Sequence, residues 1–121
     1  MPPTKFTEMR NSAELLQKVQ SNPGLILIKF TAEWCGPCKR IQSIVNNNLD
    51  DLPEDKVHYY EIDIDEHLDL YAFLKTKKMV NGIPALLAWK PENTTFIPTF
   101  VVIGANDSDI QKFFDACKNS I

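Results

Sequence analysis

Two cysteines separated by two residues are the part of this sequence best suited to chemistry. Cys35 and Cys38 lie in the segment Trp34-Cys35-Gly36-Pro37-Cys38-Lys39. A hydrophobic run at 25–30, typical of a buried strand, precedes them, and residues 39–48, typical of a helix, follow. Cys35 is therefore expected at a helix N-terminus, where unpaired N–H groups and the helix dipole favour an anion. A thiol there shifts toward thiolate, the species that attacks disulfides, so the segment predicts a dithiol–disulfide redox centre.

The surrounding segments predict the elements that hold this centre. Apolar runs and alternating patterns indicate strands at 5–9, 25–30, 57–64, 85–89 and 100–103. Helical spacing of apolar residues indicates helices after the cap Asn11, over 39–48, over 67–75, and after a cap at Asn106 or Asp107. The early alternation of strand and helix favours parallel strands with right-handed crossovers, and the last two strands should pair antiparallel. We therefore predict an α/β fold in which a mixed sheet of four to five strands carries about four helices on its two faces.

Length and charge narrow the possible functions. The chain of 121 residues suits one domain, residues 1–121, and its 44% hydrophobic content is ordinary for a globular protein. A net charge of −3 provides no basic footprint, so we expect no nucleic-acid partner. Nine of the sixteen acidic residues lie between Asp50 and Asp69. That cluster is either a solvated face or a charged surface that selects partners.

Targeting and cysteine patterns indicate a reducing compartment. No apolar run approaches the roughly 20 residues that cross a membrane, and the N-terminus lacks the apolar stretch of a signal peptide, so we expect a cytoplasmic location. Three cysteines are too few for a disulfide framework, and in a reducing compartment a Cys-x-x-Cys pair indicates redox chemistry or metal. We expect no metal, because two thiolates fall short of the four ligands of structural zinc and His58 and His67 are isolated. Cys117, on the apolar side of the last helix, acts as a small hydrophobe or is open to oxidation or intermolecular pairing.

Three further features accompany the cysteine segment 32–39: Ile62-Asp63-Ile64-Asp65, Gly82-Ile83-Pro84-Ala85-Leu86-Leu87, and Gly104 before the last helix. With these features the chain resembles the thioredoxin family over nearly its whole length. The resemblance implies a thioredoxin-like three-layer fold and an oxidoreductase that reduces disulfides in proteins. The chain has no nucleotide-binding motif, so we expect no bound cofactor, and we expect a monomer. The resemblance also implies substrates such as oxidised ribonucleotide reductase, peroxide-scavenging enzymes and methionine sulfoxide reductases. Re-reduction would come from a flavin- and NADPH-dependent thioredoxin reductase.

The resemblance also assigns roles to the cysteine segment. Cys35 would be the attacking thiolate that forms a mixed disulfide with the substrate, and Cys38 would resolve it and release reduced product. Gly36 and Pro37 would keep the loop tight, and in the family this dipeptide accompanies the reducing end of the range of potentials.

A second set of residues would bind the substrate. Trp34 is expected to form an apolar docking surface beside the cysteines, the alternative being a role in packing only. The bond before Pro84 is expected to be cis and to face the cysteines, as in the family. Ile83 would then present its backbone to a substrate segment that adds as a short strand.

The sequence departs from the family pattern at Lys29, where typical members have a buried aspartate that relays a proton for the second cysteine. Glu61 on the next strand aligns with the family's usual lysine, so the pair is inverted. A buried charge requires a partner, which favours a compensating swap. We hypothesise that Lys29 and Glu61 lie beneath Cys38 as its proton relay, with Glu61 as acceptor and Lys29 lowering the thiol pKa. The alternative is that Lys29 extends its ammonium to the surface without a catalytic role.

Other departures concern shape. Ser43 replaces a proline that kinks the active-site helix in many members, which predicts a straighter helix. Insertions of about four residues lengthen the stretch between Asp65 and Pro84, adding the lysines at 75–78, and the loop 90–99. The lysines are either a basic contact or a solvated helix end. Two other functions remain open: a disulfide isomerase or oxidant with a retuned site, and a thioredoxin-shaped scaffold without turnover.

Overall fold

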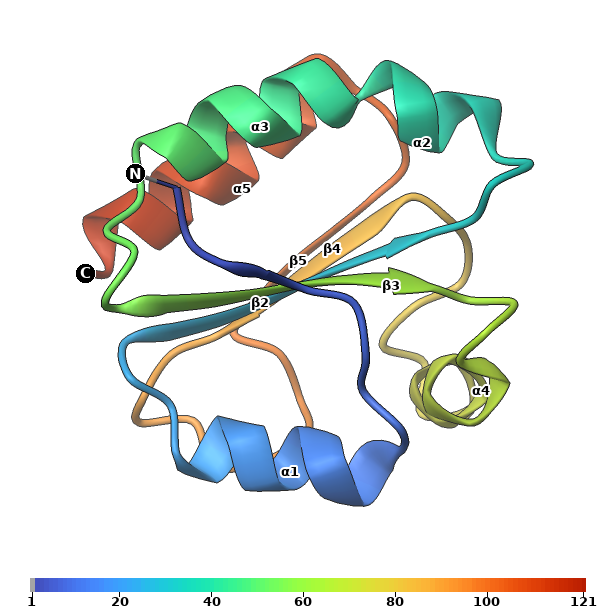
Figure 1. The fold of residues 1–121 in the computed structure, drawn as a ribbon, viewed down its shortest axis with the longest axis horizontal. Helices are drawn as coiled ribbons and strands as arrows, with labels where there is room; N and C mark the ends of the chain where they lie inside the picture. Colours follow the sequence, from blue (N-terminus) through green and yellow to red (C-terminus); the bar gives the residue numbers. More distant parts are fainter. Residues whose placement is uncertain (1) are drawn as a thin grey trace.

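Five strands form one sheet in the order β1-β3-β2-β4-β5 in the computed structural model, which describes residues 2–121 (Figure 1). The strands are β1 (Lys5–Phe6), β2 (Leu25–Thr31), β3 (Val57–Asp63), β4 (Ala85–Trp89) and β5 (Phe100–Ile103). β1 and β2 run parallel to β3, whereas β4 is antiparallel to both β2 and β5. The mixed sheet, the parallel early strands and the antiparallel last pair are confirmed.

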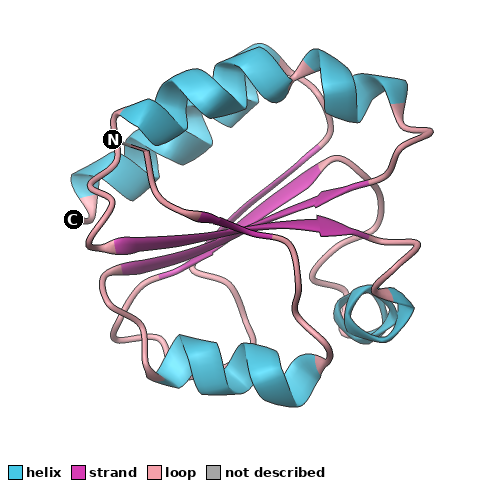
Figure 2. Cartoon of the chain, viewed as in Figure 1, coloured by secondary structure: helices cyan, strands magenta, loops and turns pink. Residues whose placement is uncertain are grey.

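Helices cover both faces of the sheet, which makes three layers (Figures 1 and 2). α2 (Gly36–Arg40), α3 (Gln42–Asp50) and α5 (Asp107–Asn119) lie on one face, and α1 (Ser12–Gln20) and α4 (Leu68–Thr76) on the other. Asn11 caps α1 and Asn106 caps α5, each accepting a backbone N–H through its side chain. Within residues 2–121, no helix combines the length and apolar character needed to cross a bilayer.

The central strand β2 is buried on both sides, as its near-continuous apolar run predicts. Ile26, Ile28 and Phe30 belong to the core beneath α1 and α4. Leu25 and Leu27 belong to the core beneath α3 and α5. Lys29 follows on this second face as a charged residue inside a buried strand, at the level of α2.

The predictions for 5–9 and 39–48 are wrong in detail. β1 is two residues long, because the chain leaves the sheet edge and buries Met9 in the core beneath α1 and α4. The helix expected over 39–48 divides at Ile41, whose ψ of −1° departs from the helical value of about −42°. Hydrogen bonds from Ile41 N to Pro37 O and from Val45 N to Ile41 O continue on either side, at 3.3 and 3.0 Å. The chain therefore bends at a buried Ile41 without a proline at position 43, and the straighter helix is not observed.

The two inserted segments pack against each other. The ring of Phe73, on α4, meets the ring of Phe96, in the 90–99 loop, edge to face at 5.3 Å. The Lys77 ammonium lies 5.8 Å from the Phe73 ring centroid and 5.9 Å from that of Phe96. This lysine therefore joins the two insertions in addition to ending the helix.

Candidate active site

Cys35 and Cys38 form a disulfide with their Cα atoms 5.3 Å apart. Cys35 is the N-cap of α2, and the backbone N–H of Cys38 donates to its sulfur at 3.1 Å. Cys38 is fully buried, and Cys35 is 4% exposed. The sulfur of Cys35 thus lies where helix N–H groups favour its thiolate, as the sequence predicted.

The cis peptide bond expected at Ile83–Pro84 is present. Ile83 packs against the buried group of Ala32, Cys35 and Cys38. The Pro84 carbonyl accepts the N–H of Gly104 at 2.8 Å, and Gly104 has a φ of +101°, which glycine tolerates and L side chains rarely adopt. Gly104 therefore anchors the segment that faces the disulfide.

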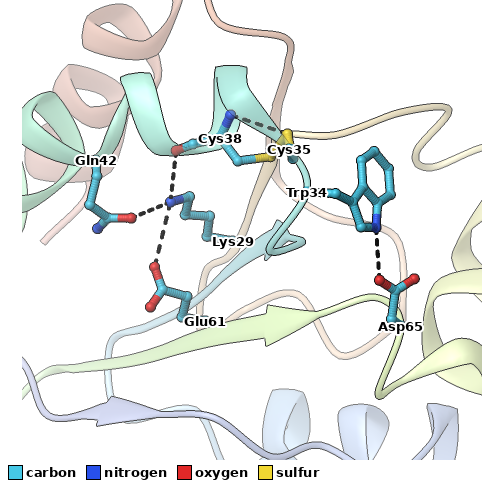
Figure 3. The surroundings of a disulfide bond; sticks show 7 residues. All are labelled: Lys29, Trp34, Cys35, Cys38, Gln42, Glu61 and Asp65. Atoms are coloured by element: carbon cyan, nitrogen blue, oxygen red, sulfur yellow. Dashed lines mark hydrogen bonds and ion pairs between the residues drawn. A yellow bond between two sulfur atoms is a disulfide. The ribbon is translucent and has the colours of Figure 1, made fainter.

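Trp34 is the most exposed large hydrophobic residue described in the structure, at 67%. Its indole Nε1 donates to Asp65 Oδ2 at 2.8 Å, and Asp65 N donates to Asp63 Oδ1 at 2.8 Å (Figure 3). The indole is thus held in place while its ring remains open to solvent. That arrangement does not fit a role in packing only.

Lys29 is 1% exposed, so the alternative in which its ammonium reaches the surface is wrong. Its Cα pairs in register with that of Glu61 on the neighbouring parallel strand. Figure 3 shows its ammonium between three oxygens under α2. It donates to Glu61 Oε1 at 3.5 Å, to the Cys38 carbonyl at 3.4 Å, and to Gln42 Oε1. The Lys29 ammonium therefore lies beneath Cys38 in contact with its backbone carbonyl, and Glu61 contacts Lys29.

Burial and Glu61 act in opposite directions on Lys29. Removal from water lowers the pKa of Lys29, and the Glu61 carboxylate raises it in part. Glu61 is 16% exposed and also pairs with Lys5 Nζ at 3.1 Å. The hydroxyl of Tyr59 has no hydrogen-bond partner among the described residues, and burial, reinforced by Glu61, raises the pKa of Tyr59 well above its usual value.

Sequence reasoning missed two members of this cluster. Gln42 follows Cys38 by four residues, so helical spacing placed it on the same face and could have identified it. Lys5 lies opposite Tyr59 in the pairing of strands β1 and β3. Its position near Glu61 depends on the order of the strands in the sheet, which the local sequence does not indicate.

Cys117 is free and fully buried in the core beneath α3 and α5, which favours its interpretation as a small hydrophobe. Burial raises the pKa of its thiol to about 12.

We expect Cys117 to resist alkylation in the native protein. With a pKa of about 12, roughly one thiol in ten thousand is ionised at pH 8. Brief treatment of the reduced protein with iodoacetamide should modify Cys35 and leave Cys117 unmodified in peptide mass maps. The same treatment in guanidinium chloride should modify all three cysteines, and native labelling of Cys117 at the rate of Cys35 would contradict its burial.

Comparison with known proteins identifies relatives that match most of the chain. The thioredoxin family model matches residues 6–116. Thioredoxin from Pseudomonas aeruginosa is 32% identical over 104 residues, which cover 86% of this chain and 89% of that protein. Thioredoxin 3 from Plasmodium falciparum is 29% identical over 110 residues, which cover 90% of this chain but 57% of that longer protein. The crystal structure of oxidised mitochondrial thioredoxin 3 from Saccharomyces cerevisiae superimposes with a TM-score of 0.70 at 26% identity, over 92% of this chain and 94% of that one.

Proposed function

Because this chain belongs to the thioredoxin family, we propose that it reduces disulfide bonds in protein substrates, with Cys35 attacking and Cys38 resolving. The observation that carries this proposal is the Cys35–Cys38 disulfide at the N-terminus of α2, where the Cys38 N–H points at the Cys35 sulfur. The Cys35 thiolate attacks one substrate sulfur, and the other leaves as a thiol. Cys38 then attacks Cys35 in the mixed disulfide, which releases the second substrate thiol and restores the Cys35–Cys38 disulfide.

We propose that the substrate docks on the surface around this disulfide. Trp34 offers an exposed ring on one side, and Ile83 packs against the cysteines from another. In this proposal the backbone of Ile83, which precedes Pro84, pairs with an extended substrate segment, and Gly36 and Pro37 start α2 without bulky side chains beside it.

We further propose that Lys29 and Glu61 assist the resolving step. Cys38 must lose a proton before it attacks the mixed disulfide, and it is fully buried. The Lys29 ammonium under α2 favours the Cys38 thiolate electrostatically, and the Glu61 carboxylate beyond it takes up the proton. The contact seen in the structure is to the Cys38 carbonyl, so Lys29 acts as a positioning residue between the carboxylate and the helix.

Electrons must come from a second partner, and we propose an NADPH-dependent thioredoxin reductase. A relative named NADPH-dependent thioredoxin reductase 3, from Arabidopsis thaliana, is 29% identical over 103 residues, which form 19% of that protein. A segment similar to this chain thus occurs within a protein named as an NADPH-dependent reductase, which supports a reductase of that kind as the electron donor. The cytoplasmic location and the monomeric state stay predictions, and a mitochondrial thioredoxin is among the similar structures.

The test of the proposed function is the reduction potential of the Cys35–Cys38 pair in glutathione buffers. Trp34 fluorescence should report the redox state, because Trp34 directly precedes Cys35. We expect a potential more negative than roughly −250 mV, at or below that of the cytosolic glutathione pool. A value near roughly −180 mV would instead assign an isomerase or oxidant retuned by Lys29 and Glu61. Failure to form the disulfide would favour a scaffold without turnover.

A further inference from the structure

Three oxygens surround the Lys29 ammonium, and the charged one is the farthest away. Glu61 Oε1 lies 3.5 Å from Lys29 Nζ and the Cys38 carbonyl oxygen lies 3.4 Å from it, both near the outer limit of a hydrogen bond. Gln42 Oε1, which carries no charge, is the nearest of the three. An ammonium bonded to a carboxylate usually lies about 2.7–2.9 Å from it, because that charge-assisted bond is the strongest available. The Lys29 ammonium is therefore held away from its counter-ion and toward α2.

The side chain of Gln42 is itself fixed in orientation. Gln42 is the first residue of α3 and follows Cys38 by four residues, so helical spacing places both on the same side. An ammonium can only donate, so the amide oxygen must face Lys29 and the amide nitrogen must point away, as Figure 3 shows. That nitrogen donates to Asn46 Oδ1 at 2.8 Å, one turn further along α3. Asn46 thus keeps the amide in the orientation that accepts from Lys29.

The position of the ammonium matters because Lys29 lies between Cys38 and Glu61. The attraction between two charges falls with distance, so an ammonium nearer α2 favours the Cys38 thiolate more, and one nearer Glu61 is neutralised there. The other charged or titratable groups described around this cluster belong to β1 and β3. Lys5 Nζ lies 3.1 Å from Glu61 Oε2, and burial together with Glu61 raises the pKa of Tyr59 well above its usual value. From the helix side the ammonium meets only neutral oxygens.

We propose that Gln42 is a positioning residue for the resolving step: its amide, oriented by Asn46, holds the Lys29 ammonium beneath Cys38 and away from Glu61. The inference rests on the proposed function and adds a residue that acts through Lys29 on the proton of Cys38. Without the amide, the ammonium moves toward the carboxylate, which attracts it more strongly than a backbone carbonyl does. The Cys38 thiolate then loses part of its stabilisation, and the thiol keeps its proton to a higher pH.

The test measures the pH at which the Cys38 thiol ionises, from its ¹³Cβ resonance in the variant Cys35→Ser. In that background Cys38 titrates alone at moderate pH, because burial raises the pKa of Cys117, the other remaining thiol, to about 12. The further change Gln42→Met keeps the length of the side chain and removes the acceptor. The midpoint should rise by about half a pH unit, which leaves roughly threefold less thiolate at any pH below it.

Two other variants separate positioning from a general loss of packing. Asn46→Ala removes the group that orients the amide, at an exposed site, and should raise the Cys38 midpoint by a smaller amount. Gln111→Met removes a similar amide from α5, where Gln111 exchanges hydrogen bonds of 3.1 and 3.0 Å with Asn48, and should leave the midpoint unchanged. Equal shifts in Gln42→Met and Gln111→Met would overturn the proposal, as would no shift in Gln42→Met.

A further background tests whether Gln42 acts through Lys29. The double change Lys29→Met/Glu61→Leu removes the ammonium and its counter-ion together. In that background Gln42→Met should no longer alter the Cys38 midpoint, because no cation is left to position. A shift of the same size there would show that Gln42 acts on Cys38 by another route, and the positioning role would be overturned.

Rapid-mixing kinetics with a synthetic disulfide peptide connect the titration to the reaction. With Cys35 present, Gln42→Met should form the mixed disulfide at close to the wild-type rate, because Cys35 makes the attack. Resolution by Cys38 should slow about twofold, since the higher nucleophilicity of a more basic thiolate offsets part of the loss of thiolate. Equal slowing of both steps would overturn a role confined to Cys38. Failure of the wild-type protein to form a mixed disulfide would overturn the proposed function itself, whereas the Cys38 titration tests Gln42 in either case.

Discussion

Replacing Cys38 with serine is expected to arrest the reaction at a covalent complex. Cys35 keeps its place at the N-terminus of α2, so its thiolate still attacks the substrate disulfide. Without the buried Cys38 thiol, nothing within the site displaces the substrate from Cys35. Steady-state reduction should fall at least about a thousandfold, and non-reducing gels and intact mass should show one substrate thiol attached per protein.

Two companion variants make this result specific. Cys35→Ser should lose activity to the same extent without an adduct, because the attacking atom is gone. Cys117→Ala should keep wild-type activity, because that thiol lies in the core beneath α3 and α5, outside the site. An adduct on the Cys35→Ser variant would mean that Cys38 attacks first, and the order of the two steps would have to be reversed.

Replacing Glu61 with glutamine is expected to reduce stability more than an ordinary polar substitution. The variant leaves the Lys29 ammonium in a site that is 1% exposed, with only neutral oxygens from Gln42 and the Cys38 backbone around it. Breaking one side of a buried ion pair typically costs about 3–5 kcal/mol, and because Glu61 is partly exposed we expect a smaller loss, about 2–3 kcal/mol. Urea unfolding of the oxidised protein measures this difference.

The chain offers a control at the same carboxylate. Lys5 contacts Glu61 from the edge strand, but its side chain is 56% exposed, so Lys5→Gln should cost less than about 1 kcal/mol. The double variant Lys29→Met/Glu61→Leu removes both charges and should recover most of the stability lost in Glu61→Gln. Equal losses for Lys5→Gln and Glu61→Gln would show that burial of Lys29 does not decide the effect.

The same variants separate structure from catalysis. If Glu61 accepts the Cys38 proton, the rate at which the mixed disulfide resolves should fall in Glu61→Gln and stay low in the double variant, although stability returns there. The pH at which the Cys38 thiol ionises should change as well. An unchanged titration and resolution rate in Glu61→Gln would remove the relay and leave Lys29–Glu61 as a structural ion pair.

The inversion of this pair shows what the family resemblance can predict about contacts between strands. Lys29 lies six residues before Cys35, and Glu61 lies on the next parallel strand, so the two were placed together before any contact was known. The structure pairs their Cα atoms in register and buries the ammonium. The pairing was predictable from the family resemblance, which aligns Glu61 with the usual lysine, whereas the near-continuous apolar run of β2 is buried on both faces and does not fix the register by itself.

The spatial arrangement of the acidic cluster between Asp50 and Asp69, by contrast, was not predictable from the sequence. In the sequence it is one run, but β3 separates its two halves by the length of a strand. Asp50, Glu54 and Asp55 are exposed near the start of β3, whereas Asp63, Asp65 and Glu66 gather beside Trp34. The structure therefore divides the cluster into two groups at opposite ends of β3, a separation that the order of charges along the sequence does not indicate.

The sequence by itself determined the elements, the redox segment and its position at a helix N-terminus, because hydrophobic periodicity and capping act over a few residues. The tertiary structure alone decided the bend at Ile41, the placement of Lys5 beside Glu61, and the burial of His67 against Asp63. These features depend on which segments distant in the chain come to share a small volume. They are set by close packing and by the pairing of buried charges between distant segments, which the spacing of residues within one segment does not indicate.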